Sequence, residues 1–388
     1  MHKEMLEKAC VDAADDWPQL PPAAEAGARL EAVDTPSLLL ELDAFEENLR
    51  TMQALVERHD VGLRAHAKAH KCPEVARRQV ALGAVGICCQ KVSEAFPFAR
   101  AGIHDILISN EVIGPAKVAM AAELARRTRL SVCIDSLAGA RALSDALVAA
   151  DARATVLVEV DVGHHRCGIA QPAEAVALAQ AAQALPMLSF GGIQAYHGTL
   201  QHKRSSEQRR QACDQVAARV RRFLAAFQAA GLPCQVVSGG GTGTAAFDAA
   251  SGVFTEIQAG SYAFMDVDYA ANDWAQTPTF RHSLFVLATV ISTPTPDRAV
   301  LDAGLKSLSA ESGLPRLHDT PGWRCTGISD EHTVLSREPD GAPLELGSKV
   351  RLVPSHVDPT FNLHDQLVVV RHGQVHALWP VAARGFSR

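Results

Sequence analysis

Short apolar runs of strand length alternate with longer segments of helical period between residues 35 and 278. A first run at 37–42 precedes a helix whose apolar face holds Phe45, Leu49 and Met52, with Asp43 as the expected N-cap. Eight β-then-α units then follow in about 210 residues, the number and length of a (β/α)8 TIM barrel. A doubly wound sheet is the competing layout, but it rarely runs to eight such units. The eight strands are expected at 61–67, 85–89, 105–108, 130–134, 155–160, 190–196, 234–237 and 255–258, with helical, Ala-rich segments such as 115–126, 138–149, 172–184 and 206–230 between them.

The pattern changes near Pro278, where the helical segments stop. Strand-like runs between Pro- and Gly-rich turns take their place at 283–292, 298–302, 349–353, 366–371 and 375–381. The sequence therefore predicts a barrel domain over 35–278 and a smaller β-rich domain over 279–388, and we expect the N-terminal arm, 1–34, to pack with the β-rich domain.

The composition is that of an ordinary globular chain, and it argues against nucleic acid and membrane as partners. The 388 residues exceed the usual size of one core, and a formal net charge of -6 argues against a nucleic-acid surface. Residues 1–22 are acidic and Ala-rich without an apolar core, so we expect neither a signal peptide nor a membrane anchor, and a cytoplasmic protein. The nine cysteines show no paired C-x-x-C spacing and fit reduced thiols, with Cys88, Cys89 and Cys133 in the core.

Polar side chains follow every predicted barrel strand, and chemistry in such barrels lies at the C-terminal strand ends. The first strand opens onto His66 and Lys68. A partly desolvated lysine with a lowered pKa is the form of amine that condenses with carbonyls, although the run taken alone favours a basic surface turn. The later strands lead to Gln90, Asn110 and Glu111, Asp135, Arg166 with its neighbours His164 and His165, Tyr196 with His197 and His202, and Gly260-Ser261-Tyr262.

A glycine run, 239–243, follows the seventh predicted strand. Glycines let backbone N–H groups surround an anion, a helix beginning at Thr244 would add its positive end, and phosphate sites in barrels typically follow strands seven and eight. The alternative is a flexible turn. A lysine after strand one with a phosphate cradle here suits pyridoxal phosphate. Arg166 would then face the pyridine nitrogen and weaken the ring as an electron sink, unless it forms only a surface ion pair.

The predicted β-rich domain contains an H-x-D pair, His356 and Asp358. On extended backbone the two side chains point to the same side, and imidazole with carboxylate is a reasonable pair for a divalent ion that keeps positions open for water or substrate. An isolated H-x-D is common by chance, and a solvated turn is the alternative.

Together these segments resemble the D-threonine aldolases, metal-activated pyridoxal phosphate enzymes of the alanine racemase-like fold type III. The resemblance rests on RAHAKAHK (64–71), GICCQK (86–91), GGGTG (239–243) and HVDPT (356–360), and covers about 34–388. The 3-hydroxy-D-aspartate aldolases look similar over the same span. The resemblance implies that Lys68 is the Schiff-base lysine and Arg166 the partner of the pyridine nitrogen. The cofactor site is expected to include His66, Gln90, Tyr196, Gly241, Thr242, Gly243, Gly260, Ser261 and Tyr262.

The resemblance also implies that His356 and Asp358 bind a divalent ion. Similar D-serine dehydratases carry cysteine, with zinc, where Asp358 stands, and the harder carboxylate favours Mn2+, Mg2+ or Co2+. The expected reaction is retro-aldol cleavage of a small-molecule D-β-hydroxy-α-amino acid to glycine and an aldehyde, with His202 as the proton acceptor. Asp330 and His332 are candidates for residues that contact the metal ligands, and the sequence does not decide whether they do.

Four alternatives remain open from the sequence. They are a 3-hydroxy-D-aspartate aldolase with glyoxylate as product, a D-serine or D-3-hydroxyaspartate dehydratase, a non-catalytic pyridoxal phosphate carrier, and a metal-only barrel hydrolase. Racemisation lacks its usual second base, because all three tyrosines, Tyr196, Tyr262 and Tyr269, precede the β-rich domain. A homodimer is expected by analogy with the fold.

Overall fold

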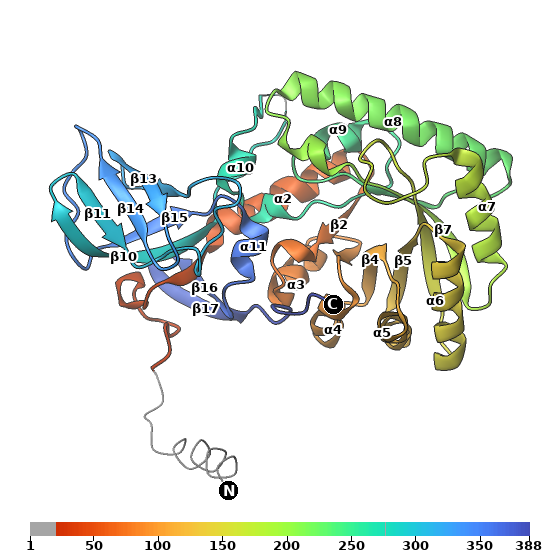
Figure 1. Ribbon diagram of the computed structural model, residues 1–388, viewed down its shortest axis with the longest axis horizontal. Helices are drawn as coiled ribbons and strands as arrows, with labels where there is room; N and C mark the ends of the chain where they lie inside the picture. The colour runs from red at the N-terminus through yellow and green to blue at the C-terminus, as the bar shows by residue number, and fades with distance from the viewer. Residues whose placement is uncertain (1–20, 276) are drawn as a thin grey trace, which may run out of the picture.

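The computed structural model describes residues 21–275 and 277–388, which form a barrel domain and a β domain lying side by side (Figure 1). Eight parallel strands close the barrel in the order of the sequence, which confirms the predicted fold class. The strands are β2 (Gly62–His66), β3 (Gly86–Cys89), β4 (Asp105–Glu111), β5 (Arg129–Ile134), β6 (Ala154–Glu159), β7 (Leu188–Ala195), β8 (Val236–Gly239) and β9 (Glu256–Ile257).

Helices surround the barrel and bury their apolar faces against it. Three of them begin with proline, whose fixed φ suits the first helical turn. In the helix that precedes the barrel, Glu41 rather than the expected Asp43 is the N-cap, because its side chain accepts a hydrogen bond from Ala44 N. The α-helices of this domain are α2 (Leu42–Arg58), α3 (Pro73–Ala81), α4 (Val92–Arg100), α5 (Pro115–Ala125), α6 (Leu137–Ala150), α7 (Pro172–Gln183), α8 (Ser206–Ala229), α9 (Ala245–Ala250) and α10 (Val267–Ala270). Its short 3-10 helices are η2 (Ala67–Ala69), η3 (Gly198–His202) and η4 (Ser261–Ala263). A further 3-10 helix, η1 (Leu30–Ala32), lies in the N-terminal arm.

The β domain is a mostly antiparallel sheet whose strands run in the order β13-β14-β11-β10-β1-β16-β17, with β15 pairing β10 and β12. Three short strands, β12, β13 and β14, were not predicted, because their half-exposed side chains form no apolar run. The strands are β1 (Ser37–Glu41), β10 (Leu284–Thr295), β11 (Arg298–Leu301), β12 (Arg316–His318), β13 (Trp323–Ile328), β14 (Thr333–Arg337), β15 (Lys349–Val353), β16 (Gln366–Arg371) and β17 (Gln374–Pro380), with one short helix, α11 (Val357–Phe361).

The first strand, β1, belongs to the β domain and not to the barrel span in which the sequence placed it. Leu39 pairs with Phe285 on β10 and with Val368 on β16, so β1 lies inside the sheet. The described part of the N-terminal arm, 21–34, contacts the same sheet through the hydrogen bonds of Gly27 N to Val375 O (2.8 Å) and of Leu30 N to Gly373 O (2.9 Å). Residues 1–20 lie outside the described range.

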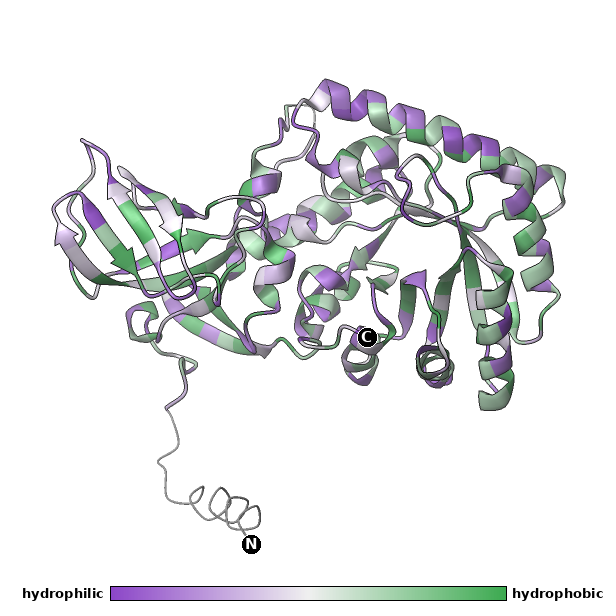
Figure 2. Ribbon diagram, in the orientation of Figure 1, coloured by the Kyte–Doolittle hydropathy of each residue, from purple (hydrophilic) through white to green (hydrophobic). Residues whose placement is uncertain are grey.

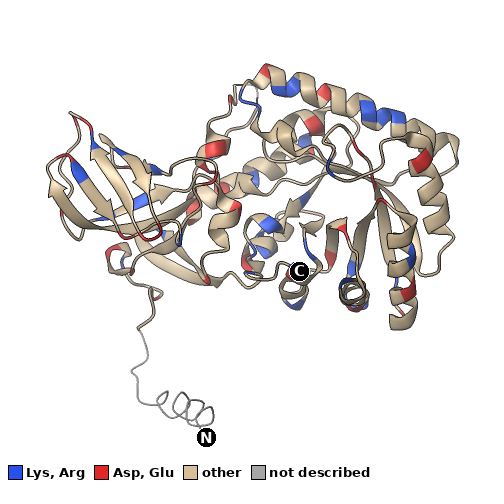
Figure 3. Ribbon diagram, viewed as in Figure 1, with Lys and Arg blue, Asp and Glu red and all other residues tan. Residues whose placement is uncertain are grey.

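Hydrophobic residues concentrate on the strands and on the inward faces of the helices (Figure 2). Basic and acidic residues are interspersed over both domains in the view of Figure 3. Within the described residues, the helices are too short or too polar to cross a bilayer.

The two domains meet at the C-terminal mouth of the barrel, where α11 packs against η2 (Figure 1). Phe361 on α11 contacts Phe264 of the barrel edge to face, with ring centroids 5.0 Å apart. Backbone hydrogen bonds of Val267 N to Pro354 O (3.1 Å) and of Asp268 N to Ser355 O (3.3 Å) join the segments of the two domains. This junction brings the lysine run and the H-x-D pair to one place.

Candidate active site

A cavity of about 300 Å3 lies at the C-terminal end of the barrel strands. Five residues of the expected site line it: His66, Lys68, Gln90, Arg166 and Tyr196. The other three, Ser109, Gln194 and Gln258, were not predicted, because each lies at the end of an apolar strand and resembles a satisfied core polar residue. Gln258 Nε2 donates to Gln194 Oε1 (2.6 Å) and to Ser238 Oγ (2.7 Å), so these amides form a polar floor.

Lys68 extends from η2 and connects the barrel with the β domain. Its Nζ donates to Asp358 Oδ2 at 2.6 Å. Asp358 raises the pKa of Lys68 against the opposing effect of burial, so the expectation of a lowered pKa is wrong for this arrangement. Burial alone would raise the pKa of Asp358, but Lys68, through its charge and its hydrogen bond, and His356 together outweigh burial, and the pKa falls to about 2. The two groups therefore form an ion pair between the domains.

His66, the last residue of β2, is a neutral imidazole in this cavity. Burial lowers its pKa to about 3, and the Lys68 charge adds to the effect. Its Nε2 lies 3.4 Å from Ser109 Oγ, while Nδ1 is buried without a hydrogen-bond partner. Gln90 Nε2 donates to the Ser109 carbonyl at 3.3 Å.

Arg166 reaches the cavity from the loop that follows β6. Its guanidinium lies over the ring of Tyr196, 5.5 Å from the centroid, and its Nη2 is 3.6 Å from Glu159 Oε1. Burial, together with the neighbouring Glu111, raises the pKa of Glu159 to about 8. The guanidinium is thus the dominant positive charge on this side of the cavity.

The glycine run after β8 is packed too closely for side chains. A Cβ on Gly243 would lie 2.5 Å from Gln201 O, and one on Gly241 would lie 2.7 Å from Gln201 Oε1. Gly243 N donates to Gln201 Oε1 at 2.8 Å, and Thr244 is the N-cap residue of α9, as the sequence predicts for the helix that starts here. Thr242 Oγ1 accepts from Tyr262 N at 3.0 Å, which ties the run to η4.

The segment 260–262 links the glycine run with Lys68. A Cβ on Gly260 would lie 2.8 Å from His66 O, and Ser261 Oγ donates to Asp358 Oδ1 at 3.4 Å. The Tyr262 side chain instead is fully buried, and its hydroxyl accepts from Gln79 Nε2 at 3.1 Å on the side of α3. Tyr262 therefore contributes its backbone to this region, and its ring belongs to the core.

The H-x-D pair lies at the start of α11. His356 is extended (φ -146°, ψ 126°), but Asp358 is in the first helical turn, so the expected two-residue extended arrangement is wrong. The pair still converges, because His356 Nε2 lies 3.8 Å from Asp358 Oδ1. Two ligands of one ion bound at about 2.1 Å lie roughly 3–4 Å apart, so the spacing fits a shared divalent cation.

His356 and Asp358 are a pair of candidate ligands rather than a larger cluster. Within the described residues, no group of three or more His, Cys, Asp or Glu side chains is arranged to hold a metal. Asp330 and His332 are exposed in the turn between β13 and β14. Glu311, which the sequence did not indicate, contacts His356 Nδ1.

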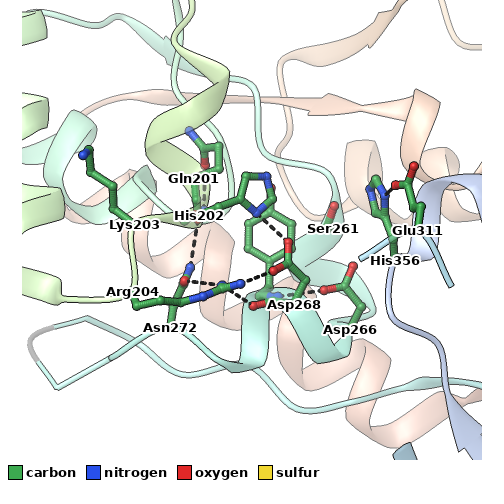
Figure 4. A network of polar contacts seen from close by, with 12 residues as sticks. Gln201, His202, Lys203, Arg204, Ser261, Asp266, Asp268, Asn272, Glu311 and His356 are labelled. Atoms are coloured by element: carbon green, nitrogen blue, oxygen red, sulfur yellow. Dashed lines mark hydrogen bonds and ion pairs between the residues drawn. The ribbon is translucent and has the colours of Figure 1, made fainter. Parts of the chain in front are cut away.

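His202 ends η3 and does not line the cavity. Its Nδ1 lies 2.6 Å from Asp268 Oδ2, and Arg204 pairs with the other oxygen of the same carboxylate (Figure 4). The imidazole lies beside the ring of Tyr269, with centroids 5.5 Å apart. An aspartate on Nδ1 leaves Nε2 as the free nitrogen, the arrangement of a histidine that accepts protons.

Asp266 is a second residue that the sequence did not single out. Its Oδ1 accepts from Tyr269 N (2.8 Å) as the cap of α10, and its Oδ2 accepts from Val357 N (3.1 Å), the first residue of α11. Burial raises the pKa of Asp266 to about 6. The signal in the sequence, an aspartate before a short helix, predicts the cap but not the contact with α11.

A larger hollow of about 670 Å3 lies on the β domain, away from these groups. Its cationic side chains are already engaged, Arg351 by Asp319 and Lys349 by the Val33 carbonyl. The smaller cavity therefore is the better candidate for chemistry, because it holds a lysine, an imidazole and a guanidinium that face one space.

Comparison with known proteins agrees with this geometry. The family model described as alanine racemase, N-terminal domain, matches residues 40–268, and the putative serine dehydratase domain matches residues 283–370. The D-threonine aldolase of Arthrobacter sp is 58% identical over 369 residues, which cover 95% of this chain and 97% of that protein.

Two further relatives are similar over nearly the whole chain. The 3-hydroxy-D-aspartate aldolase of Paracoccus denitrificans (strain Pd 1222) is 43% identical over 377 residues, 95% of this chain and 96% of that protein. The crystal structure of D-threonine aldolase from Filomicrobium marinum has a TM-score of 0.92 and 47% identity, and the match covers 95% of this chain and 100% of that one.

Proposed function

The chain belongs to the D-threonine aldolase family, built on the alanine racemase-like barrel, and we propose that it cleaves D-β-hydroxy-α-amino acids of the D-threonine type to glycine and an aldehyde. The observation that carries the proposal is the 2.6 Å contact of Lys68 Nζ with Asp358 Oδ2. It places the lysine suited to hold a carbonyl cofactor beside the carboxylate suited to hold a divalent ion, although the two residues come from different domains.

The barrel cavity fits pyridoxal phosphate. Lys68 is the residue that would bond its aldehyde, the glycine run with Thr242 and Ser261 would hold its phosphate, and Arg166 would face its pyridine nitrogen. When bound, this cofactor supplies an acceptor for the electron pair that remains on Cα after the Cα–Cβ bond breaks. His66 is neutral and adds no competing charge to Arg166.

The pair His356 and Asp358 fits a divalent ion of the hard type. One imidazole and one carboxylate leave coordination positions for water and for the substrate hydroxyl, and the carboxylate oxygen favours Mn2+, with Mg2+ or Co2+ as the next choices. Such an ion supplies a Lewis acid that makes a hydroxyl easier to deprotonate.

We assign the proton acceptor to His202. Asp268 orients its ring through Nδ1, and Nε2 is left to take the proton of the β-hydroxyl, directly or through a water molecule. His202→Asn tests the assignment. General-base catalysis typically contributes about 10²–10⁴-fold to the rate, so kcat of this variant should decrease by a factor in that range. A normal turnover rate in this variant would remove His202 from the mechanism.

Two other enzyme functions have a specific observation in their favour. The 43% identity to a 3-hydroxy-D-aspartate aldolase keeps a β-carboxylate substrate in view. The match of 283–370 to a putative serine dehydratase domain supports a dehydratase, but the carboxylate of Asp358 favours a harder ion than the zinc that the resemblance associates with dehydratases. A carrier role does not explain the His356–Asp358 pair, and a metal-only hydrolase does not explain Lys68.

Product analysis decides among these functions. The purified protein is incubated with pyridoxal phosphate and Mn2+ on D-threonine, D-serine and D-3-hydroxyaspartate, with and without EDTA. Glycine plus aldehyde, abolished by EDTA, supports the aldolase, and the relative rates name the substrate. Keto acid plus ammonia would mean a dehydratase, and a protein that takes up no coloured cofactor would contradict the proposal altogether.

We also propose a cytoplasmic location and a homodimer. The eight cysteines of the described residues are free thiols, five of which are buried, and this suits a reducing compartment. The homodimer rests on analogy with the fold.

A further inference from the structure

Glu311 lies on the segment between β11 and β12, and its carboxylate contacts Nδ1 of His356 (Figure 4). We propose that Glu311 is a positioning residue that fixes the tautomer and orientation of His356 and thereby sets the affinity of the divalent-ion site. The inference rests on the proposed metal role of His356 and Asp358, and it assigns a function to a residue 45 positions away in the sequence.

The contact dictates which imidazole nitrogen is free. A carboxylate only accepts hydrogen bonds, so the proton of a neutral His356 lies on Nδ1 and the lone pair lies on Nε2. Nε2 is the nitrogen that faces Asp358 Oδ1, at 3.8 Å. The other tautomer would place a hydrogen between the two ligands and leave the Nδ1 lone pair against the Glu311 carboxylate. The carboxylate on Nδ1 also increases the basicity of Nε2.

The segment that carries Glu311 is fixed to the helix that carries the ligands. Ser309 N donates to Thr360 Oγ1 (3.1 Å), and Ser355 Oγ donates to Ser309 O (2.9 Å). Thr360 Oγ1 in turn donates to His356 O at 2.8 Å. These bonds anchor the backbone two residues before Glu311 to α11 and the residue that precedes its N-cap, although the Glu311 side chain is 58% exposed. A surface ion pair between two mobile side chains would not show such anchoring.

The test measures Mn2+ binding to the pyridoxal phosphate-loaded protein, with free Mn2+ followed by electron paramagnetic resonance. Loss of a carboxylate that orients a metal-bound histidine typically costs 10–100-fold in metal affinity, so Glu311→Ala should raise the Kd for Mn2+ by that factor. Glu311→Gln keeps an acceptor oxygen and should raise the Kd by only a few-fold. Saturating Mn2+ should restore kcat in both variants.

Glu331→Gln is the matched control, because Glu331 is similarly exposed (54%) and its ion pair in the described part of the chain is with Lys306 of the β domain. It should leave the Kd unchanged, and circular dichroism should show that all variants are folded. A Kd for Glu311→Ala within twofold of the parent would overturn the inference.

His356→Ala separates this inference from the proposed function. If His356→Ala abolishes Mn2+ binding while Glu311→Ala does not weaken it, only the role of Glu311 fails. If His356→Ala also binds Mn2+ like the parent, the metal is held elsewhere, and both the inference and the proposed metal site fail.

Discussion

Asp248 on α9 is a buried carboxyl beneath the glycine run, and replacing it with asparagine should change how stability depends on pH. Its side chain is 4% exposed, and a Cβ on Gly240 would lie 2.8 Å from its Oδ2. Burial raises the pKa of Asp248 to about 7, from an ordinary value of about 3.9 in the unfolded chain. The folded protein therefore holds this proton more tightly than the unfolded chain does.

The sign follows from linkage. Because the folded state binds more protons between about pH 4 and pH 7, the free energy of unfolding falls as the pH rises through this range. A shift of about 3 units corresponds to about 4 kcal/mol, of which roughly 2–3 kcal/mol falls between pH 5 and pH 8. The asparagine of Asp248→Asn cannot ionise. As the pH rises from 5 to 8, the free energy of unfolding of this variant should therefore increase relative to that of the parent by up to that amount.

Urea-induced unfolding followed by tryptophan fluorescence at pH 5, 6, 7 and 8 measures the difference. The test uses only the change with pH of the difference in free energy of unfolding between variant and parent. Any effect of the amide that does not depend on pH cancels in this comparison. Asp214→Asn, which removes a 64% exposed carboxylate from α8, is the control and should run parallel to the parent. If Asp248→Asn also runs parallel, burial does not hold the proton on Asp248 and the reasoning is refuted.

Three further variants test the cofactor site. Lys68→Ala should lose the visible colour of bound cofactor and the activity, because no other lysine lines the cavity, and an absorbance spectrum after dialysis checks it. Gly243→Ala places a Cβ 2.5 Å from Gln201 O, which displaces the glycine run at a cost of about 1–3 kcal/mol. The Kd for pyridoxal phosphate, measured by fluorescence titration, should therefore rise about tenfold. Gly327→Ala, with open space around its Cβ, is the control. Tyr262→Phe should cost about 1–3 kcal/mol of stability but leave that Kd within twofold, because the lost hydroxyl faces away from the cavity.

The barrel was predictable because its signal is local. Each of the eight strands is an apolar run followed by a helical segment, and the observed strands fall within a few residues of the expected ones. The run at 37–42 looks the same in the sequence, yet β1 pairs with β10 and β16 about 245 and 330 residues away. Sheet membership depends on such long-range pairing, which the local pattern does not contain.

For the site, too, the residues with a local signal were predictable, and the properties that depend on distant residues were not. Lys68, His356 and Asp358 stand out because their residue types are unusual where they occur, at a strand end and in a short H-x-D run. The raised pKa of Lys68 was not predictable, because its cause is Asp358, 290 residues away. Gln194 and Gln258 were not predictable either, since a glutamine at a strand end gives no sign of the cavity it faces.

The short helix α10 explains how two domains can keep a proposed base and a proposed metal site at a constant distance. Its N-cap, Asp266, accepts a hydrogen bond from Val357 N at the start of α11, which carries the proposed metal ligand Asp358, and its second helical residue, Asp268, holds His202 through Nδ1. Two carboxylates two residues apart on one rigid turn thus fix both partners. A base on a loop and a ligand on a separate domain would otherwise move independently, whereas proton removal from a metal-activated hydroxyl requires hydrogen-bond distances to be kept. In the proposed function, the junction between the domains therefore positions the chemistry, because Lys68 comes from the barrel domain and Asp358 from the β domain.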